Sequence, residues 1–290
     1  TLLGGAITDT GSQNLTFAGA FTNNASSRTL TNNLSSGSKV ILSNTVNLSE
    51  SNTARTLTIS GTGDTDITGT VVNGGTGAGV LAKSGTGVLT LSNTGNTYTG
   101  GTAVNAGTLR TGASGVIPDT GTVTVNATTA GTALLDLNGN SDSIAALTFG
   151  GTGGLAGSVN QETTGLGTLT LGGTVTVSAT GNFTTPALLS GNVALGANRT
   201  FTIGDSTGTV VDLDAQAVLS GAFSLTKGGA GTMQLGGANT YSGGTTINTG
   251  EIRSGAANVL PNTGTITVNN PSGSSAVLNL NGFNDTIAAL

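Results

Sequence analysis

Tyr98-Thr-Gly-Gly-Thr-Ala-Val-Asn-Ala-Gly-Thr-Leu-Arg110 recurs further along the chain as Tyr241-Ser-Gly-Gly-Thr-Thr-Ile-Asn-Thr-Gly-Glu-Ile-Arg253. Both stretches belong to a longer repeat, because residues 98–147 and 241–290 align without a gap and 27 of the 50 pairs are identical. Most other pairs exchange Val for Ile, Ser for Thr or Asp for Asn. A long internal repeat is typical of a stacked, quasi-linear fold in which each unit buries its apolar face against the next.

The repeat extends upstream at an offset of 144, where Arg55-Thr-Leu-Thr-Ile59 matches Arg199-Thr-Phe-Thr-Ile203. Further back, Asn14-Leu-Thr-Phe-Ala-Gly19 resembles Thr168-Leu-Thr-Leu-Gly-Gly173 after an indel of about ten residues. We therefore expect two units, residues 1–147 and 148–290, in one continuous solenoid. Joining the end of the second unit to the start of the chain nearly regenerates the 147/148 junction. The sequence is thus expected to be a segment of a longer tandem array.

Short runs of alternating apolar and Thr residues indicate β-strands. Examples are Thr122-Val-Thr-Val125, Thr168-Leu-Thr-Leu171 and Thr265-Ile-Thr-Val268. This period of two gives each strand one buried and one solvent-exposed face. No window shows a sustained helical period. Charged residues make up only 7% of the chain, and the 50 glycines would penalise helices. Low charge with many β-branched residues also argues against disorder.

These features predict an all-β fold, a right-handed parallel β-helix of about a dozen rungs. With roughly 20–25 residues per rung and about 4.8 Å between rungs, the rod would be on the order of 60 Å long. Leu, Val and Ile would fill the interior, with Thr and Ser outside. Asn residues at matched turns, Asn105/Asn248 and Asn138/Asn281, could stack as amide ladders.

Composition excludes several classes of function. The net charge is −5 and the basic residues are scattered singly, so nucleic acid is not an expected partner. The absence of cysteine excludes disulfides and thiolate metal sites. No apolar run is long enough to cross a bilayer, so membrane insertion of this segment is not expected. No cofactor is expected either.

Candidate catalytic residues are few, because without His or Cys neither a Ser/His/Asp triad nor a Cys nucleophile is available. The close carboxylate pairs are Asp64 with Asp66 and Asp212 with Asp214. On a strand, both members of such a pair would share a face, the minimum for acid–base chemistry. The favoured interpretation is solvated carboxylates flanking turns, and we assign no catalytic residue.

Two glycine-rich patterns could suggest ion or phosphate sites. Gly61-Thr-Gly-Asp-Thr-Asp66 partly resembles the Gly/Asp-rich motif of calcium β-rolls, which needs tandem copies. It occurs once, with no Asp expected at the matching place in the second unit, so no calcium site is expected. Residues 150–154 and Gly243-Gly244 lack the Lys-Ser/Thr and helix of a phosphate loop and predict turns.

Several charged residues recur in both units and are interpreted as scaffold. They are Arg55/Arg199, Lys83/Lys227, Arg110/Arg253 and Asp142/Asp285. An Arg beside a rung corner can satisfy turn carbonyls, with weak polyanion binding as the alternative. The Thr-x-Thr runs raise the further alternative of an ice-binding face, but their spacing in sequence (122, 168, 174, 200) is irregular.

The segment Lys83-Ser-Gly-Thr-Gly-Val-Leu-Thr-Leu-Ser-Asn-Thr-Gly-Asn-Thr-Tyr-Thr-Gly-Gly-Thr102, continued by Ala106-Gly-Thr-Leu-Arg110, resembles the autotransporter-associated β-strand repeat, also called the passenger-associated transport repeat. The stretch of residues 227–245 resembles it more closely. Together, the two copies of the signature make up roughly a fifth of the chain. The resemblance implies a β-helical passenger region of large bacterial surface or secreted proteins, where the repeat assists export and builds a stalk. It implies no catalytic residue.

We therefore expect a non-enzymatic structural segment at the bacterial cell surface or in the extracellular space. It would form a stalk or fibre by tandem continuation or by head-to-tail stacking on itself. The alternative is an adhesin that binds surface glycans or host proteins through a lateral face. An ice-binding or polysaccharide-acting β-helix comes third.

Overall fold

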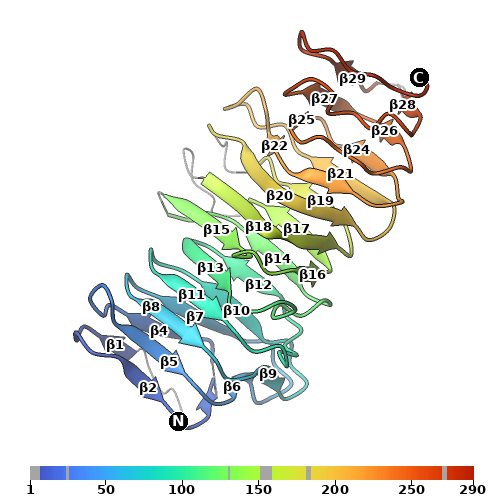
Figure 1. Cartoon of the computed structure of the whole chain (residues 1–290). Coiled ribbons are helices and arrows are strands. Elements are labelled where there is room, and N and C mark those ends of the chain that lie inside the picture. Colours follow the sequence, from blue (N-terminus) through green and yellow to red (C-terminus); the bar gives the residue numbers. More distant parts are fainter. Residues whose placement is uncertain (1–6, 24–25, 130, 151–158, 181–183, 270–272) are drawn as a thin grey trace.

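The computed structural model describes residues 7–23, 26–129, 131–150, 159–180, 184–269 and 273–290. Within these ranges every regular element is a β-strand, and paired strands run parallel to each other. The strands stack along one axis, with β1 and β29 at opposite ends of the stack (Figure 1). The predicted all-β parallel solenoid is confirmed. No helix long and apolar enough to cross a membrane occurs in the described ranges.

One sheet holds twelve strands, one per rung, which agrees with the expected number of about a dozen. They are β1 (Ile7–Asp9), β4 (Arg28–Asn32), β7 (Thr56–Ser60), β10 (Val80–Lys83), β12 (Thr102–Val104), β14 (Thr122–Val125), β17 (Ala146–Phe149), β19 (Val175–Val177), β21 (Arg199–Ile203), β24 (Leu225–Gly228), β26 (Thr245–Ile247) and β28 (Ile266–Val268).

A second sheet holds fourteen strands. Its main path is β2 (Leu15–Phe17), β5 (Lys39–Leu42), β8 (Asp64–Ile67), β11 (Val88–Leu91), β13 (Gly107–Thr111), β15 (Thr132–Asp136), β18 (Val159–Leu171), β20 (Ala187–Leu195), β22 (Leu213–Ala215), β25 (Thr232–Leu235), β27 (Gly250–Ser254) and β29 (Ala276–Asn279). Beside this path, β16 (Asp142–Ile144) pairs with β18 and β23 (Val218–Ser220) pairs with β20. A third sheet near the N-terminal end contains β3 (Phe21–Thr22), β6 (Val46–Ser49) and β9 (Val71–Gly74).

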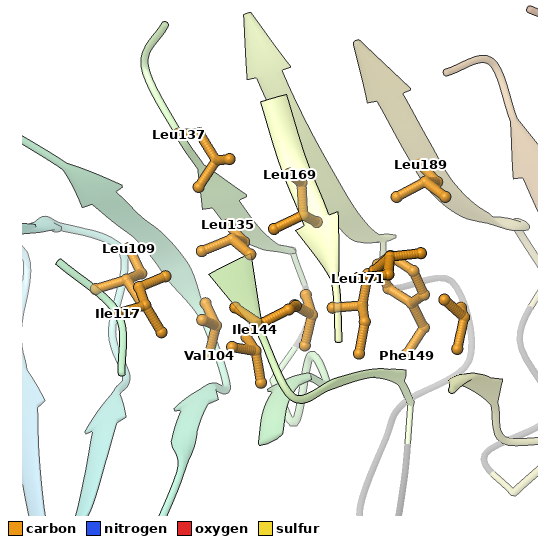
Figure 2. Close-up of a cluster of buried hydrophobic side chains, with 14 of the residues drawn as sticks. Val104, Leu109, Ile117, Leu135, Leu137, Ile144, Phe149, Leu169, Leu171 and Leu189 are labelled. Carbon is orange, nitrogen blue, oxygen red and sulfur yellow. The ribbon is translucent and has the colours of Figure 1, made fainter. Parts of the chain in front are cut away.

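Alternation along each strand builds the core. In β14, Val123 and Val125 are fully buried while Thr122 is exposed. Because the strands stay in register, inward residues form columns, such as Val104, Val125, Phe149, Val177 and Ile203. Figure 2 shows buried hydrophobic side chains, aliphatic ones and Phe149, that meet across the interior where the two units join. Each such side chain contributes about 1.5–3 kcal/mol through burial.

Rung length varies more than the sequence suggested. Val104 pairs with Val125, whereas Phe149 pairs with Val177, so the second of these rungs contains several more residues than the first. Part of the difference lies in β18, which has 13 residues where β13 has five. The ladder is unbroken at the expected unit boundary, since β17 runs across residues 147 and 148.

The structure corrects one detail of the repeat. The column Phe17, Leu42, Ile67 and Leu91 corresponds, rung by rung, to Glu162, Leu189, Ala215 and Leu235. The strand β2 therefore takes the place of the first half of β18, not that of residues 168–171. The expected match of residues 14–19 with residues 168–173 is wrong, because similar Leu-Thr alternation occurs on both sides of the solenoid.

The register also differs between the two copies by two residues. Leu57 pairs with Leu81, but Phe201, its counterpart in sequence, pairs with Lys227, the counterpart of Lys83. A shift of two keeps every side chain on its original face. Core and surface are therefore unchanged by it.

The two large sheets carry different outer faces. Charged side chains gather on the strands of the fourteen-stranded sheet, where Lys39 pairs with Asp66 and Arg110 with Asp136, at 2.9 and 2.8 Å. On the twelve-stranded sheet, outward positions are mostly Thr, Ser or Ala. Outward-facing charged side chains are therefore concentrated on the fourteen-stranded sheet, whereas Thr, Ser and Ala predominate on the twelve-stranded sheet.

Candidate functional site

Each signature segment places a lysine inside the solenoid. Lys227 is fully buried, and its Nζ donates hydrogen bonds to the carbonyl oxygens of Gly228, Gly229 and Thr249 at 2.9, 2.8 and 3.1 Å. Its strand, β24, ends where the chain turns at Gly229, whose φ of 77° is left-handed. The turn aims carbonyl groups inward, and an ammonium group supplies the three donors that they need.

Lys83 occupies the same position in the first copy and is 2% exposed. Its Nζ contacts the carbonyl oxygens of Ser84, Gly85 and Ala106. Burial lowers the pKa of Lys83 and of Lys227 to about 8. The nearby Asp64 and Asp212 each oppose this shift of the lysine pKa.

A glycine of the next rung closes over each ammonium group. At Gly250 a Cβ would lie 2.7 Å from Nζ of Lys227 and 2.5 Å from the carbonyl oxygen of Gly229. Its φ of 71° also disfavours a side chain. Gly107 has the same surroundings above Lys83. The signature therefore needs glycine at Gly107 and Gly250, because any side chain there would collide with the lysine of the preceding rung.

The carboxylate pairs occupy equivalent positions, which the sequence comparison missed. Asp64 accepts a hydrogen bond from the backbone N–H of Val88 at 2.9 Å, and Asp212 accepts one from Thr232 at 2.8 Å. The donors Val88 and Thr232 are 144 residues apart, the offset at which the two copies align in this region, whereas Asp64 and Asp212 are further apart than that. The expectation that the second unit lacks a matching Asp is wrong, because the turn before Asp212 is longer than the turn before Asp64.

The second member of each pair also has partners. Asp66 forms the ion pair with Lys39, and Asp214 accepts hydrogen bonds from Gln216 and Gln234 at 2.7 and 3.2 Å. Asp212 is only 4% exposed and also accepts from the N–H of Ser206, so the expectation of a solvated carboxylate is wrong there. In the described ranges, no three or more acidic residues come close enough to hold a metal ion.

The signature asparagine joins three successive rungs. Asn239 accepts from the N–H of Leu219 at 2.8 Å and donates to the carbonyl of Val259 at 2.7 Å. Asn96 does the same between Val71 and Val116, at 2.7 and 2.8 Å. The sequence motif contains this side chain but does not indicate its role, which only the stacking of the rungs reveals.

The signature tyrosines are fully buried, and each forms a hydrogen bond with a threonine of the same motif. Tyr98 bonds to Thr102 at 2.7 Å and Tyr241 to Thr245 at 2.6 Å. A buried phenol needs such a partner. The Tyr-x-Gly-Gly-Thr spacing therefore supplies both the ring and the hydroxyl that satisfies it.

The recurring aspartates bind backbone of the preceding rung. Asp142 accepts from the N–H groups of Val116 and Ile117 at 2.9 and 3.2 Å. Its counterpart Asp285 accepts from Leu260 at 3.0 Å. Burial raises the pKa of Asp142 to about 6. Both residues hold a turn against its neighbour, as expected of scaffold.

The arginines behave less uniformly. Arg199 donates from Nε to the carbonyl oxygen of Leu171 at 2.8 Å, as expected for an Arg at a rung corner. Arg110 pairs with Asp136 instead, and Arg253 lies 3.4 Å from Glu251. The buried Nη1 of Arg55 has no hydrogen-bond partner in the described part of the chain.

The predicted amide ladders form only in part. Asn269 donates to the side chain of Asn248 on the neighbouring rung at 2.8 Å. Asn138 and Asn281 are in the left-handed conformation, with φ of 51°, and reach back to carbonyl groups of the preceding rung. Gly243-Gly244 forms the expected turn, with φ of 88° at Gly244. Of the other glycine run, residues 151–154 lie outside the described ranges.

The Thr-x-Thr runs are more regular in space than in sequence. Thr124, Thr148, Thr176 and Thr202 stand in register on four successive rungs. A second column of Thr200, Thr226, Thr246 and Thr267 continues it. The irregular spacing in sequence arises partly because Thr168 lies on β18 of the other large sheet, while Thr122 and Thr200 lie on the twelve-stranded sheet. It is therefore no argument against a threonine ladder.

Comparison with known proteins agrees with these observations. The family model of the passenger-associated-transport-repeat matches residues 81–110 and 225–253. The adhesin BmaC autotransporter of Brucella suis biovar 1 (strain 1330) is 33% identical over 216 residues, which cover 67% of this chain and 5% of that protein. The chain thus spans about a twentieth of the length of this relative. No solved structure matches the chain.

The matched segments begin shortly before each buried lysine and end at Arg110 and Arg253, so they contain the lysine, asparagine, tyrosine and glycine described above. The chain is a parallel β-solenoid that carries two passenger-associated transport repeats.

Proposed function

We propose that this segment is a non-enzymatic, rod-like spacer of a large bacterial surface or secreted protein. The observation that carries the proposal is the uninterrupted sheet of twelve strands, which runs from β1 to β28 along one axis (Figure 1). A spacer needs its two attachment points far apart and a shape that does not collapse. The buried lysine, asparagine and aspartate contacts serve the second need, because each fastens one rung to the next.

The contacts of the four paired aspartates support a structural role. Asp64, Asp66, Asp212 and Asp214 are engaged with backbone or neighbouring side chains. The relative named an adhesin autotransporter supports a location at the cell surface or outside the cell. The spacer would continue as a tandem array or by stacking of copies.

A distance measurement tests the spacer directly. The chain contains no cysteine, so spin labels can be placed at Thr16→Cys on β2 and Val277→Cys on β29. These strands are eleven steps apart in the sheet order, which predicts a narrow distance distribution centred at about 50 Å within one chain. Dilution with unlabelled protein removes contributions between chains. A short or broad distribution would contradict the rod.

A second function, adhesion through the lateral surface, is favoured by one observation. Two equivalent pockets, of about 390 and 500 Å³, open beside Gly107 and Gly250, one per repeat. Hydroxyl groups line both, those of Thr108 and Thr132 in the first and of Thr249 and Ser275 in the second. Such groups suit a hydroxylated ligand, so a carbohydrate is the partner we propose for this alternative.

A glycan array with the purified chain tests the adhesin alternative. We expect selected glycans to bind, and expect the double variant Thr132→Trp/Ser275→Trp, which fills both pockets, to lose that binding. The double variant Thr124→Trp/Thr148→Trp on the other sheet is the matched control and should bind as before. No binding on the array, or equal loss in both variants, would exclude these pockets.

A further inference from the structure

The outer face of the twelve-stranded sheet carries a regular array of threonines on its interior rungs, from β14 to β26. Strand register arranges them in two ranks, two residues apart along each strand. The first rank consists of Thr122, Ala146, Thr174, Thr200, Thr226 and Thr246, and the second of Thr124, Thr148, Thr176 and Thr202. We call these residues the threonine face. Every strand that carries it is paired on both sides.

The hydroxyl groups of the threonine face are available to solvent. Elsewhere in the chain, threonine hydroxyls bond to backbone, as Thr111 does to the carbonyl of Leu137 at 2.6 Å. Among the described residues, no hydrogen bond engages the threonine hydroxyls of this face. Thr122, Thr174 and Thr202 are exposed, and the other members are half-buried, as expected for side chains that stack on one another.

The two ranks form a nearly rectangular mesh. Neighbouring rungs are about 4.8 Å apart, and alternate residues of one strand are about 6.7 Å apart. The χ1 angle of threonine is restricted, so the hydroxyl and methyl groups should repeat with the backbone. Five steps from β14 to β26 make the mesh about 24 Å long. A surface that repeats in two directions is complementary to the surface of a crystal, which does the same.

The chemistry of the threonine face selects among crystals. Neither rank contains a charged side chain, which binding to an ionic mineral would require. Neither contains an aromatic ring on which the sugars of a crystalline polysaccharide could stack. A hydroxyl group both donates and accepts, so it can take the place of a water molecule in a hydrogen-bonded lattice. Oxygen atoms on the prism face of ice repeat on a rectangular mesh of similar dimensions.

We propose that the threonine face binds ice. Water molecules held by the two ranks of hydroxyl groups join the surface of the crystal, and the methyl groups between them pack against it. Growth then continues only between bound molecules, where the ice front must curve, and this lowers the freezing point below the melting point. The proposal requires only the stacked rungs from β14 to β26 and does not depend on the role of a spacer.

The gap between the melting and freezing points of a single ice crystal tests the proposal. The purified chain should open a gap that widens with protein concentration, and the crystal should grow facets. The double variant Thr148→Tyr/Thr176→Tyr places two bulky rings on adjacent rungs in the middle of the face. It should lose most of the gap while its circular dichroism and melting temperature stay close to those of the unmodified chain.

Thr90→Tyr/Thr170→Tyr is the matched control. Both of these threonines are half-buried, outward residues of the fourteen-stranded sheet, on β11 and β18, away from the threonine face. This variant should keep the full gap. An equal loss of the gap in both double variants would overturn the assignment to the threonine face.

Partitioning into slowly grown ice tests the unmodified chain without any substitution. The chain should be enriched in the ice, whereas albumin in the same solution should stay in the liquid. A chain that stays in the liquid with albumin and opens no gap would overturn the proposal. Its spin labels could still lie about 50 Å apart, so ice binding can fail while the proposed spacer stands.

Discussion

Replacing Lys227 with methionine is expected to lower the free energy of unfolding by about 3–5 kcal/mol. Methionine has nearly the same length but no donor, so the carbonyl groups of Gly228, Gly229 and Thr249 would remain buried without partners. Each unsatisfied group costs about 1–3 kcal/mol. The loss should be measured by chemical denaturation at pH 7, where both the folded and the unfolded chain hold the lysine proton.

Lys39→Met is the matched control for this variant. The Lys39 side chain is 44% exposed and pairs with Asp66 at 2.9 Å, an arrangement worth at most about 1 kcal/mol. If Lys227→Met costs no more than Lys39→Met, the carbonyl groups must find water, and the ammonium group does not fasten the rungs. Lys83→Met should repeat the large effect in the first copy.

Replacing Glu162 with leucine is expected to stabilise the chain by about 2 kcal/mol at pH 7. Glu162 is fully buried between Leu135 and Leu189, and neither carboxylate oxygen has a hydrogen-bond partner in the described part of the chain. Burial raises the pKa of Glu162 well above its ordinary value. The backbone N–H of Ser190, which does not reach normal hydrogen-bond geometry, opposes this shift in part, and the charge of Asp136 adds to it. Leucine would complete the aliphatic column.

The same carboxyl group predicts the direction of the pH dependence. Below the pKa of the unfolded chain both states hold the proton; between that value and the raised folded pKa, the folded state holds more protons. Stability therefore falls as the pH rises through this window. Asp142 and Asp212, whose pKa values burial also raises, add to the effect.

The melting temperature should thus be higher at pH 5 than at pH 7.5, and the difference should shrink in Glu162→Leu. Glu162→Gln is the control, because it removes the titration but keeps a buried polar group, so it should flatten the pH dependence with a smaller gain. If the melting temperatures of Glu162→Leu and Glu162→Gln change with pH as steeply as that of the unmodified chain, Glu162 is not buried in solution.

The fold could be predicted because its causes are local. Alternation such as Thr122-Val-Thr-Val125 specifies one buried face per strand, and recurrence at a nearly constant offset indicates stacking. Handedness and exact registers depend on how rungs of unequal length meet, which no local pattern records. The match of residues 14–19 failed for this reason, since Leu-Thr alternation is common to every side of the solenoid.

The polar contacts were predictable only in part. Recurrence marked Lys83, Lys227, Asp142 and Asp285 as scaffold, but not their partners. The equivalence of Asp64 and Asp212 was missed in the sequence. An alignment at a fixed offset cannot match residues that follow turns of different length in the two copies. Glu162 could not be anticipated, because nothing in Asn160-Gln-Glu-Thr163 separates a buried glutamate from an exposed one. Only the neighbouring rungs decide that.

The two-residue difference in register between the copies has a consequence for how such rods diverge. Leu57 pairs with Leu81 while Phe201 pairs with Lys227, yet both arrangements keep the same faces inside. Changes that slide a strand by an even number of residues leave the interior intact, whereas odd ones would turn it outward. Selection should therefore act on whether a strand insertion is even or odd in number of residues, and less on how many residues it adds. Insertions within strands should accumulate in pairs, while turns drift freely.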